Sequence, residues 1–249
     1  MKNLKYVTIG ILPLMWTVYF LFELFTGRVT DITTILGNVA LIALFALVGF
    51  YFYNMSKKYP KGFTCKTMII IFSMLMLVDQ GIKIIIKNFF FNDRFEIIKG
   101  FLSFHPIINT DGSWLNARFN TSLSFPLLIF VNFIALFVFF ELYRYYLHKG
   151  NNSFHGDMCF LFIFSGALCS LIDKIFYGGS LDFIGISNLF IADIKDIYIN
   201  LGILFFILLL LISGYLTEEE NTTFKDDINS IKRFIKFSKN DILSILKNK

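Results

Sequence analysis

The sequence is poor in charged residues, which make up 16% of its 249 residues, whereas about 25% is usual in soluble domains. Hydrophobic residues make up 56%, and they fall in long runs rather than in short patches. This pattern excludes an ordinary soluble domain and predicts helices that face lipid. The apolar runs predict membrane lipid among the partners. The formal net charge of +5 is modest, so we expect no nucleic acid.

Metal-binding patterns are also missing from the sequence. The three histidines are scattered and form no H-E-x-x-H pair; they are His105, His148 and His155. The three cysteines share no metal-like spacing, and two lie inside apolar runs, as is typical of small buried hydrophobic residues; they are Cys65, Cys159 and Cys169. We therefore expect no metal and no cofactor.

Six stretches are apolar over about 20 residues, the length that a helix needs to cross a bilayer. They are roughly 5–26, 32–54, 66–86, 125–147, 157–177 and 196–215. The first begins with lysines, as a signal peptide does. However, its apolar run is too long, contains Glu23 and lacks an A-x-A-like end, so we expect a retained helix.

Lysine and arginine predict the orientation, because they concentrate in cytoplasmic segments. With the N-terminus in the cytoplasm, the segments on that side carry 15 of the 23 Lys and Arg residues. Both termini are then cytoplasmic. The basic tail, 217–249, spaces its apolar residues like an amphipathic helix, which predicts contact with anionic lipid at the membrane surface. A solvated, unstructured tail is the alternative.

Two longer segments, 88–124 and 178–195, then lie together on the outer side. Residues 95–104 alternate between apolar and polar, which predicts short strands on the membrane surface.

Ionisable residues near these outer ends require an explanation, because each costs at least about 2.5–3.5 kcal/mol in hydrocarbon. Asp79 and Lys83 stand four residues apart, so they share a helix face and can pair. Asp173 ends the fifth span, Asp182 follows in the outer loop, and Asp193 opens the sixth span. Four aspartates at one depth and on one side indicate a functional site.

Paired carboxyl groups suit peptide hydrolysis without a metal. Two carboxylates brought close together cannot both ionise cheaply, so one keeps its proton. The ionised group can take a proton from water, while the protonated group can donate to a carbonyl or a leaving amine. The pattern therefore predicts an aspartic-type peptidase.

The order of the motifs resembles that of the lipoprotein signal peptidase family (signal peptidase II). Residues 79–83 (DQGIK) match its D-Q-x-x-K, residues 98–102 (IKGFL) resemble I-P-G-F-x, and Asn109 opens a stretch like N-x-G-A-A-[FW]. Residues 165–174 align with G-G-A-x-G-N-x-x-D-R. Residues 180–184 and 190–193 then stand where V-V-D-F and the end of F-N-x-A-D are expected.

The resemblance covers roughly residues 66–214. Together with the six apolar spans, it implies an all-α integral membrane protein of six transmembrane helices with a small extracytoplasmic β-cradle. Two added helices (1–62) would precede a four-helix catalytic core (63–216), and a basic cytoplasmic tail (217–249) would follow. By analogy, Asp182 and Asp193 are the catalytic pair. The residues that would bind substrate or support the site are Asp79, Lys83, Asn109, Asp173 and Lys174.

The resemblance also implies the reaction and the location. The protein would cleave prolipoprotein signal peptides before the diacylglyceryl-modified cysteine, as a monomer in the bacterial cytoplasmic membrane with its site facing outward. The sequence departs from the family where Gly-Asn becomes Cys169-Ser170, Arg becomes Lys174 and Asn becomes Phe190.

These departures motivate an alternative, a relative that binds lipidated peptides or protein partners without cutting them. A rhomboid-like serine protease would need a G-x-S-G serine and a later histidine, which the sequence lacks. A transporter would place its ionisable residues at the bilayer midplane rather than at the outer face.

Overall fold

The computed structural model describes residues 2–110, 124–213 and 224–247. Within this part, six helices are long and apolar enough to cross a membrane, which confirms the predicted spans. They are α1 (Lys2–Phe25), α2 (Ile32–Lys58), α3 (Cys65–Ile85), α5 (Phe125–His148), α6 (Phe154–Phe176) and α7 (Ile194–Ile212). A short π-helical segment, η1 (Ile86–Phe90), continues α3.

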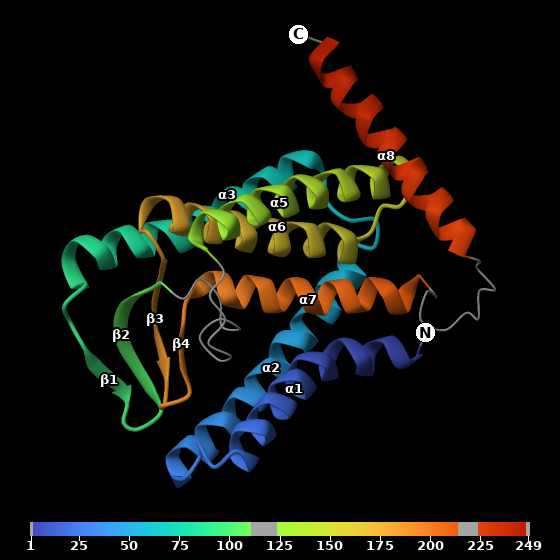
Figure 1. The fold of residues 1–249 in the computed structure, drawn as a ribbon. Coiled ribbons are helices and arrows are strands. Elements are labelled where there is room, and N and C mark those ends of the chain that lie inside the picture. Colours follow the sequence, from blue (N-terminus) through green and yellow to red (C-terminus); the bar gives the residue numbers. More distant parts are fainter. Residues whose placement is uncertain (1, 111–123, 214–223, 248–249) are drawn as a thin grey trace.

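A four-stranded antiparallel sheet lies at one end of the helix bundle, which we call the sheet end (Figure 1). Its strands, in spatial order, are β1 (Phe95–Ile98), β2 (Leu102–Asn109), β3 (Ser180–Ile186) and β4 (Phe190–Ala192). The alternation in the sequence predicted β1 and β2. The other two strands arise from 178–195, for which no strand was predicted, since β3 is largely buried on both faces and alternates between polar and apolar residues only over its first four positions.

Helices α6 and α7 form the centre of the bundle, and glycines let them approach closely. A Cβ atom on Gly166 would lie 2.8 Å from the Ile199 side chain and 3.2 Å from the backbone oxygen of Lys195, and one on Gly202 would lie 3.1 Å from the backbone nitrogen of Ile163. This contact brings the end of α6 against the start of α7.

The two N-terminal helices share this core rather than standing apart from it. Phe52 of α2 is buried against Phe205 of α7, with ring centroids 5.0 Å apart, and Leu12 of α1 belongs to the same apolar cluster. At the sheet end, α1 and α2 extend beside the turn between β3 and β4 (Figure 1).

The tail forms a helix, α8 (Phe224–Lys247), which crosses the end of α5 that lies far from the sheet (Figure 1). Arg144 of α5 pairs with Asp241 at 2.6 Å, and the ring of Tyr145 lies 5.1 Å from that of Phe237. Apolar side chains on α8, including Ile231 and Ile235, remain more than half exposed. An exposed apolar face beside basic residues is what a membrane-surface helix requires.

We predict that α8 attaches to anionic lipid. A cysteine introduced at Ile235, with Cys65 changed to Ser, should react with a water-soluble maleimide more slowly in anionic nanodiscs than in zwitterionic ones. Replacing Lys232, Arg233 and Lys236 by Gln should weaken attachment about 100-fold and abolish this difference, because each basic residue contributes about 1 kcal/mol near an anionic surface. The same replacements at three exposed lysines at and just after the end of α2, Lys57, Lys58 and Lys61, are the control. Equal labelling in both lipids would contradict membrane attachment.

Candidate active site

The site begins with an ion pair on α3. Asp79 and Lys83 are fully buried at the sheet end, and Lys83 Nζ donates to Asp79 Oδ2 at 2.9 Å. Their four-residue spacing places both side chains on one helix face, as the sequence predicted. Neighbouring Gln80 donates its amide to Asp79 at 2.9 Å and to Asp173 of α6 at 3.1 Å, which links the two helices.

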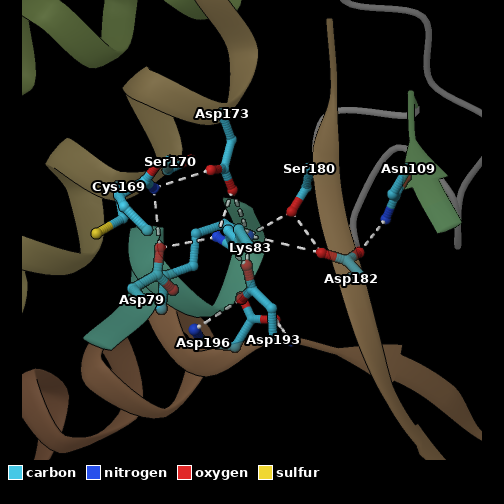
Figure 2. Close-up of polar contacts among 12 residues, drawn as sticks. Asp79, Lys83, Asn109, Cys169, Ser170, Asp173, Ser180, Asp182, Asp193 and Asp196 are labelled. Atoms are coloured by element: carbon cyan, nitrogen blue, oxygen red, sulfur yellow. Dashed lines mark hydrogen bonds and ion pairs between the residues drawn. The ribbon is translucent and has the colours of Figure 1, made fainter. Parts of the chain in front are cut away.

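Lys83 connects three carboxyl groups from three elements. Besides Asp79, its ammonium lies 2.6 Å from Asp173 Oδ2 on α6 and 2.6 Å from Asp193 Oδ2 at the start of α7. None of these four side chains is exposed. A lysine ammonium has three N–H donors, and here each of the three can serve one carboxylate (Figure 2).

Local folding rules position Asp182 and Asp193, the two aspartates that the family resemblance singles out as a pair. Asp182 lies on β3 opposite Ile107 of β2. Asp193 is the N-cap of α7: its side chain accepts from the backbone nitrogen of Asp196 at 3.2 Å, and the side chain of Asp196 accepts from the backbone nitrogen of Asp193 at 3.1 Å. This capping box satisfies two otherwise unpaired donors at the helix start.

The carboxyl groups of Asp182 and Asp193 come close together. Oxygen atoms of these two residues and of Asp196 all lie within 4.8 Å of one another. One water molecule can bridge oxygens up to about 5.6 Å apart through two hydrogen bonds of ordinary length. Asp182 and Asp193 are both buried, so they can act on the same water molecule.

Lys195 is the most central of the site residues that the sequence patterns do not indicate, a set that also includes Ser180 and Asp196. It lies in the first turn of α7, is 5% exposed, and places its ammonium 2.5 Å from Asp193 Oδ2, 3.4 Å from Asp173 Oδ2 and 3.6 Å from Asp182 Oδ1. It also donates to the hydroxyl of Ser180. A lysine at the start of an apolar span was the available signal, since such a charge requires a partner.

The two aspartates have different surroundings. Burial raises the pKa of the Asp182 carboxyl above its usual value, although Lys195 and hydrogen bonds from Ser180 and from Asn109, at 3.0 Å, oppose this shift. Burial also opposes ionisation of Asp193, but the ammonium groups of Lys195 and Lys83 outweigh it and hold the pKa of that carboxyl below its usual value. A proton on this pair is therefore favoured on Asp182.

Three carboxyl groups so close together also resemble a set of metal ligands. Two ammonium groups, those of Lys195 and Lys83, already contact Asp193 at 2.5 and 2.6 Å. The structure thus supplies positive charge to the cluster from its own lysines.

The positions that depart from the family motifs lie beside the site. Lys174 does not contact any of the carboxylates among the described residues; its ammonium donates to Ser170 Oγ at 2.5 Å. Cys169 is fully buried, with its sulfur 3.6 Å from that of Met76. Of the expected supporting residues, the structure thus brings Asp79, Lys83, Asn109 and Asp173 into the cluster, and it places Lys174 at its edge. Residues 111–114 of the Asn109 motif lie outside the described part.

Comparisons with known proteins agree with this architecture. The family model described as "Signal peptidase (SPase) II" matches residues 69–212, more than half of the chain. A bacterial membrane enzyme solved by the in meso method at 2.3 Å resolution is similar in fold, with a TM-score of 0.53, 24% identity, and coverage of 66% of this chain and 99% of its own. A second such structure, at 1.9 Å resolution, gives 0.50, 24%, 61% and 97%. No curated protein matches the chain.

We predict that the stability of the folded protein depends on the ammonium of Lys83, which neutralises the buried carboxylates around it. Lys83→Met leaves Asp79 and Asp173 buried with one ammonium fewer, and removing one partner of a buried pair costs about 3–5 kcal/mol. Thermal unfolding in detergent should therefore show a clearly lower midpoint. Lys174→Met, which removes an ammonium bonded to Ser170, is the matched control and should change the midpoint little. Equal midpoints in the two variants would contradict the central role of Lys83.

Proposed function

Because the chain belongs to the signal peptidase II family, we propose that it is an aspartic-type endopeptidase that cleaves prolipoprotein signal peptides before the diacylglyceryl-modified cysteine, with Asp182 and Asp193 as its catalytic pair. The observation that carries this proposal is the closeness of the two carboxyl groups, within 4.8 Å at the same buried position. Two carboxyl groups that share one proton over a peptide carbonyl are sufficient for hydrolysis without a cofactor.

Because their surroundings differ, the two aspartates would have different roles in the first step, Asp193 as general base and Asp182 as general acid. Asp193, the ionised member, takes a proton from the attacking water as its oxygen bonds to the carbonyl carbon. Asp182, the protonated member, donates its proton to the carbonyl oxygen. The tetrahedral intermediate then collapses: Asp182 takes back a proton from one of its two hydroxyl groups, the C–N bond breaks, and the proton held by Asp193 passes to the leaving amine. Both groups act as acid or base in turn, as general acid–base catalysis requires.

The remaining residues would keep Asp193 ionised and Asp182 correctly oriented. Lys83 and Lys195 keep Asp193 ionised, since both contact it at 2.6 Å or less. Asn109 and Ser180 orient Asp182 through hydrogen bonds. Asp79 and Asp173 balance Lys83 and fix its ammonium between α3, α6 and α7.

The substrate would approach from the bilayer. Helices of this family lie in the bacterial inner membrane, and the six apolar helices make the chain a multi-pass member. Exposed apolar side chains on β1, among them Phe95 and Ile97, extend an apolar surface beyond the helices. We propose that acyl chains of the substrate enter laterally, that a monomer suffices, and that the sheet end faces outward, because the Lys and Arg distribution favours cytoplasmic termini.

The first test replaces each carboxyl group. Asp182→Asn and Asp193→Asn should each abolish cleavage of a prolipoprotein reporter while the protein remains inserted in the membrane. Asp93→Asn, which changes an exposed aspartate before β1, should cleave normally. Retained cleavage in either variant would remove that residue from the catalytic pair. Wild-type protein that binds the reporter without cutting it would instead favour the non-cleaving relative.

A second test uses pH. The hydrogen bond from Asn109 lowers the pKa of Asp182, so Asn109→Ala should raise that pKa. Because the reaction needs Asp182 protonated, activity should be lost at high pH, and the alkaline limb of kcat/KM should move to higher pH in this variant. A limb that stays in place or moves to lower pH would contradict the assignment of the proton to Asp182.

A third test compares two lysines. Lys195→Met removes an ammonium 2.5 Å from Asp193 and should lower kcat about 100-fold or more, in the range of losses for a charge-stabilising group. It should also move the acidic limb of the pH profile to higher pH, since Lys195 holds the pKa of Asp193 down. Lys174→Met is the control, with a loss of a few fold at most. Equal effects would contradict the role given to Lys195.

A further inference from the structure

The two N-terminal helices hold the turn that joins β3 to β4, which we call the hairpin tip (residues 187–189). Arg28, just after α1, donates from Nη2 to the backbone oxygens of Asn188 at 3.1 Å and Leu189 at 2.7 Å. Its Nη1 donates to both carboxylate oxygens of Glu23, at 3.1 and 3.2 Å. Glu23 is fully buried. It therefore fixes the guanidinium of Arg28 through Nη1, while Nη2 binds the backbone of the hairpin tip.

Helix α2 makes a second attachment to the same tip. Thr34 bonds through its hydroxyl to the hydroxyl of Ser187 at 2.9 Å and to the carboxylate of Asp31 at 2.7 Å. Ser187 has a left-handed backbone with φ of 47°, which is uncommon for a residue other than glycine. Its nitrogen donates to the backbone oxygen of Phe101 at 2.6 Å, in the turn between β1 and β2. The tip is therefore held from α2 and from the sheet at once.

Aromatic packing adds a third attachment, and it uses a position where the family motif has Asn. The ring of Phe190 lies 5.6 Å from that of Tyr19 and 6.1 Å from that of Trp16, both on α1. Leu189 is buried in the same cluster with Phe20. At this position the chain thus has an aromatic side chain, which packs against α1, where the family motif has a polar one.

The hairpin tip is connected mechanically to both catalytic candidates. Asp182 lies on β3, and Asp193 follows β4 directly; the strands pair from Ile186 with Phe190 to Ile184 with Ala192. Four residues of strand lie between Asp182 and the tip, so five steps of about 3.3 Å, or about 16 Å, separate Asp182 from Ser187. A shift of the tip relative to the bundle therefore moves both carboxyl groups relative to α3 and α6, which carry Asp79, Lys83 and Asp173.

We propose that the α1–α2 helices are a built-in clamp that sets the position of the β3–β4 hairpin and, through it, of Asp182 and Asp193, with Arg28 as the positioning residue. This inference rests on the proposed function for its effect on catalysis, but the clamp itself is a structural claim. A planar guanidinium can serve a carboxylate and two carbonyl oxygens together, and a lysine ammonium cannot reproduce that geometry.

The kinetic test replaces Arg28. Arg28→Ala should lower kcat of reporter cleavage about 10- to 100-fold with little change in KM, because small displacements of catalytic groups cost rates of that order. Arg28→Lys should recover part of the loss. Arg94→Ala removes an exposed arginine at the opposite edge of the sheet and is the control. A rise in KM with unchanged kcat would contradict positioning, since it would indicate a role in substrate binding.

A disulfide provides the rescue. Thr34→Cys with Ser187→Cys, added to Arg28→Ala, replaces a hydroxyl pair 2.9 Å apart by a covalent link between α2 and the tip. Cleavage should return when the disulfide forms and fall again when it is reduced. If the disulfide forms in good yield and activity stays low, the clamp does not act by fixing the tip.

The clamp can also be tested without measuring cleavage, by the rate of amide hydrogen exchange in the β3–β4 hairpin. Amide hydrogen exchange of residues 185–193 should be faster in Arg28→Ala than in wild type and slower again in the oxidised disulfide variant. Unchanged exchange would overturn the clamp. Faster exchange in a protein whose wild type cleaves no prolipoprotein would support the clamp and contradict the proposed function, so the two failures are distinguishable.

Discussion

Two buried ammonium groups hold four carboxyl groups together at the sheet end, and the rest of the site depends on this neutralisation. Lys83 contacts Asp79, Asp173 and Asp193, and Lys195 contacts Asp173, Asp182 and Asp193. If all four carboxyl groups were ionised, two negative charges would remain uncompensated away from water, which is costly. The cluster, to which Asp196 adds a further carboxyl group, therefore favours binding a proton, and within the Asp182–Asp193 pair this proton is favoured on the more weakly compensated Asp182.

Three helices and one strand carry all the charged side chains of this cluster. One helix face provides Asp79 and Lys83, the end of α6 provides Asp173, and the start of α7 provides Asp193 and Lys195 within a single turn. The close approach of α6 and α7 at Gly166, where a Cβ would lie 3.2 Å from the backbone oxygen of Lys195, allows both helices to reach the same ammonium groups. The sheet then adds Asp182 from a different direction (Figure 2).

Much of this could be predicted from the sequence, because the signals were local. Apolar runs of the right length gave the six spans, and the spacing of Asp79 and Lys83 gave their pairing. The role of Lys195 could not be predicted in full, because two of its partners, Asp173 and Asp182, come from α6 and β3 and only tertiary structure shows them. For the same reason, Lys174 was expected in the site on the strength of its motif position, whereas the structure directs its ammonium to Ser170.

The departures from the family motifs also have a physical explanation in part. Phe190 packs against Trp16 and Tyr19 of α1, and Ser170 accepts a hydrogen bond from Lys174 at 2.5 Å. For Cys169 in place of glycine, the structure shows a fully buried side chain with its sulfur 3.6 Å from that of Met76.

The central claim is that Asp182 and Asp193 share one proton, held by Asp182. Infrared difference spectroscopy of wild type against Asp182→Asn, at the pH of maximal cleavage, tests it most directly. We expect the substitution to remove a protonated-carboxyl stretching band. Loss of a carboxylate band alone would show that Asp182 is ionised and would contradict the account.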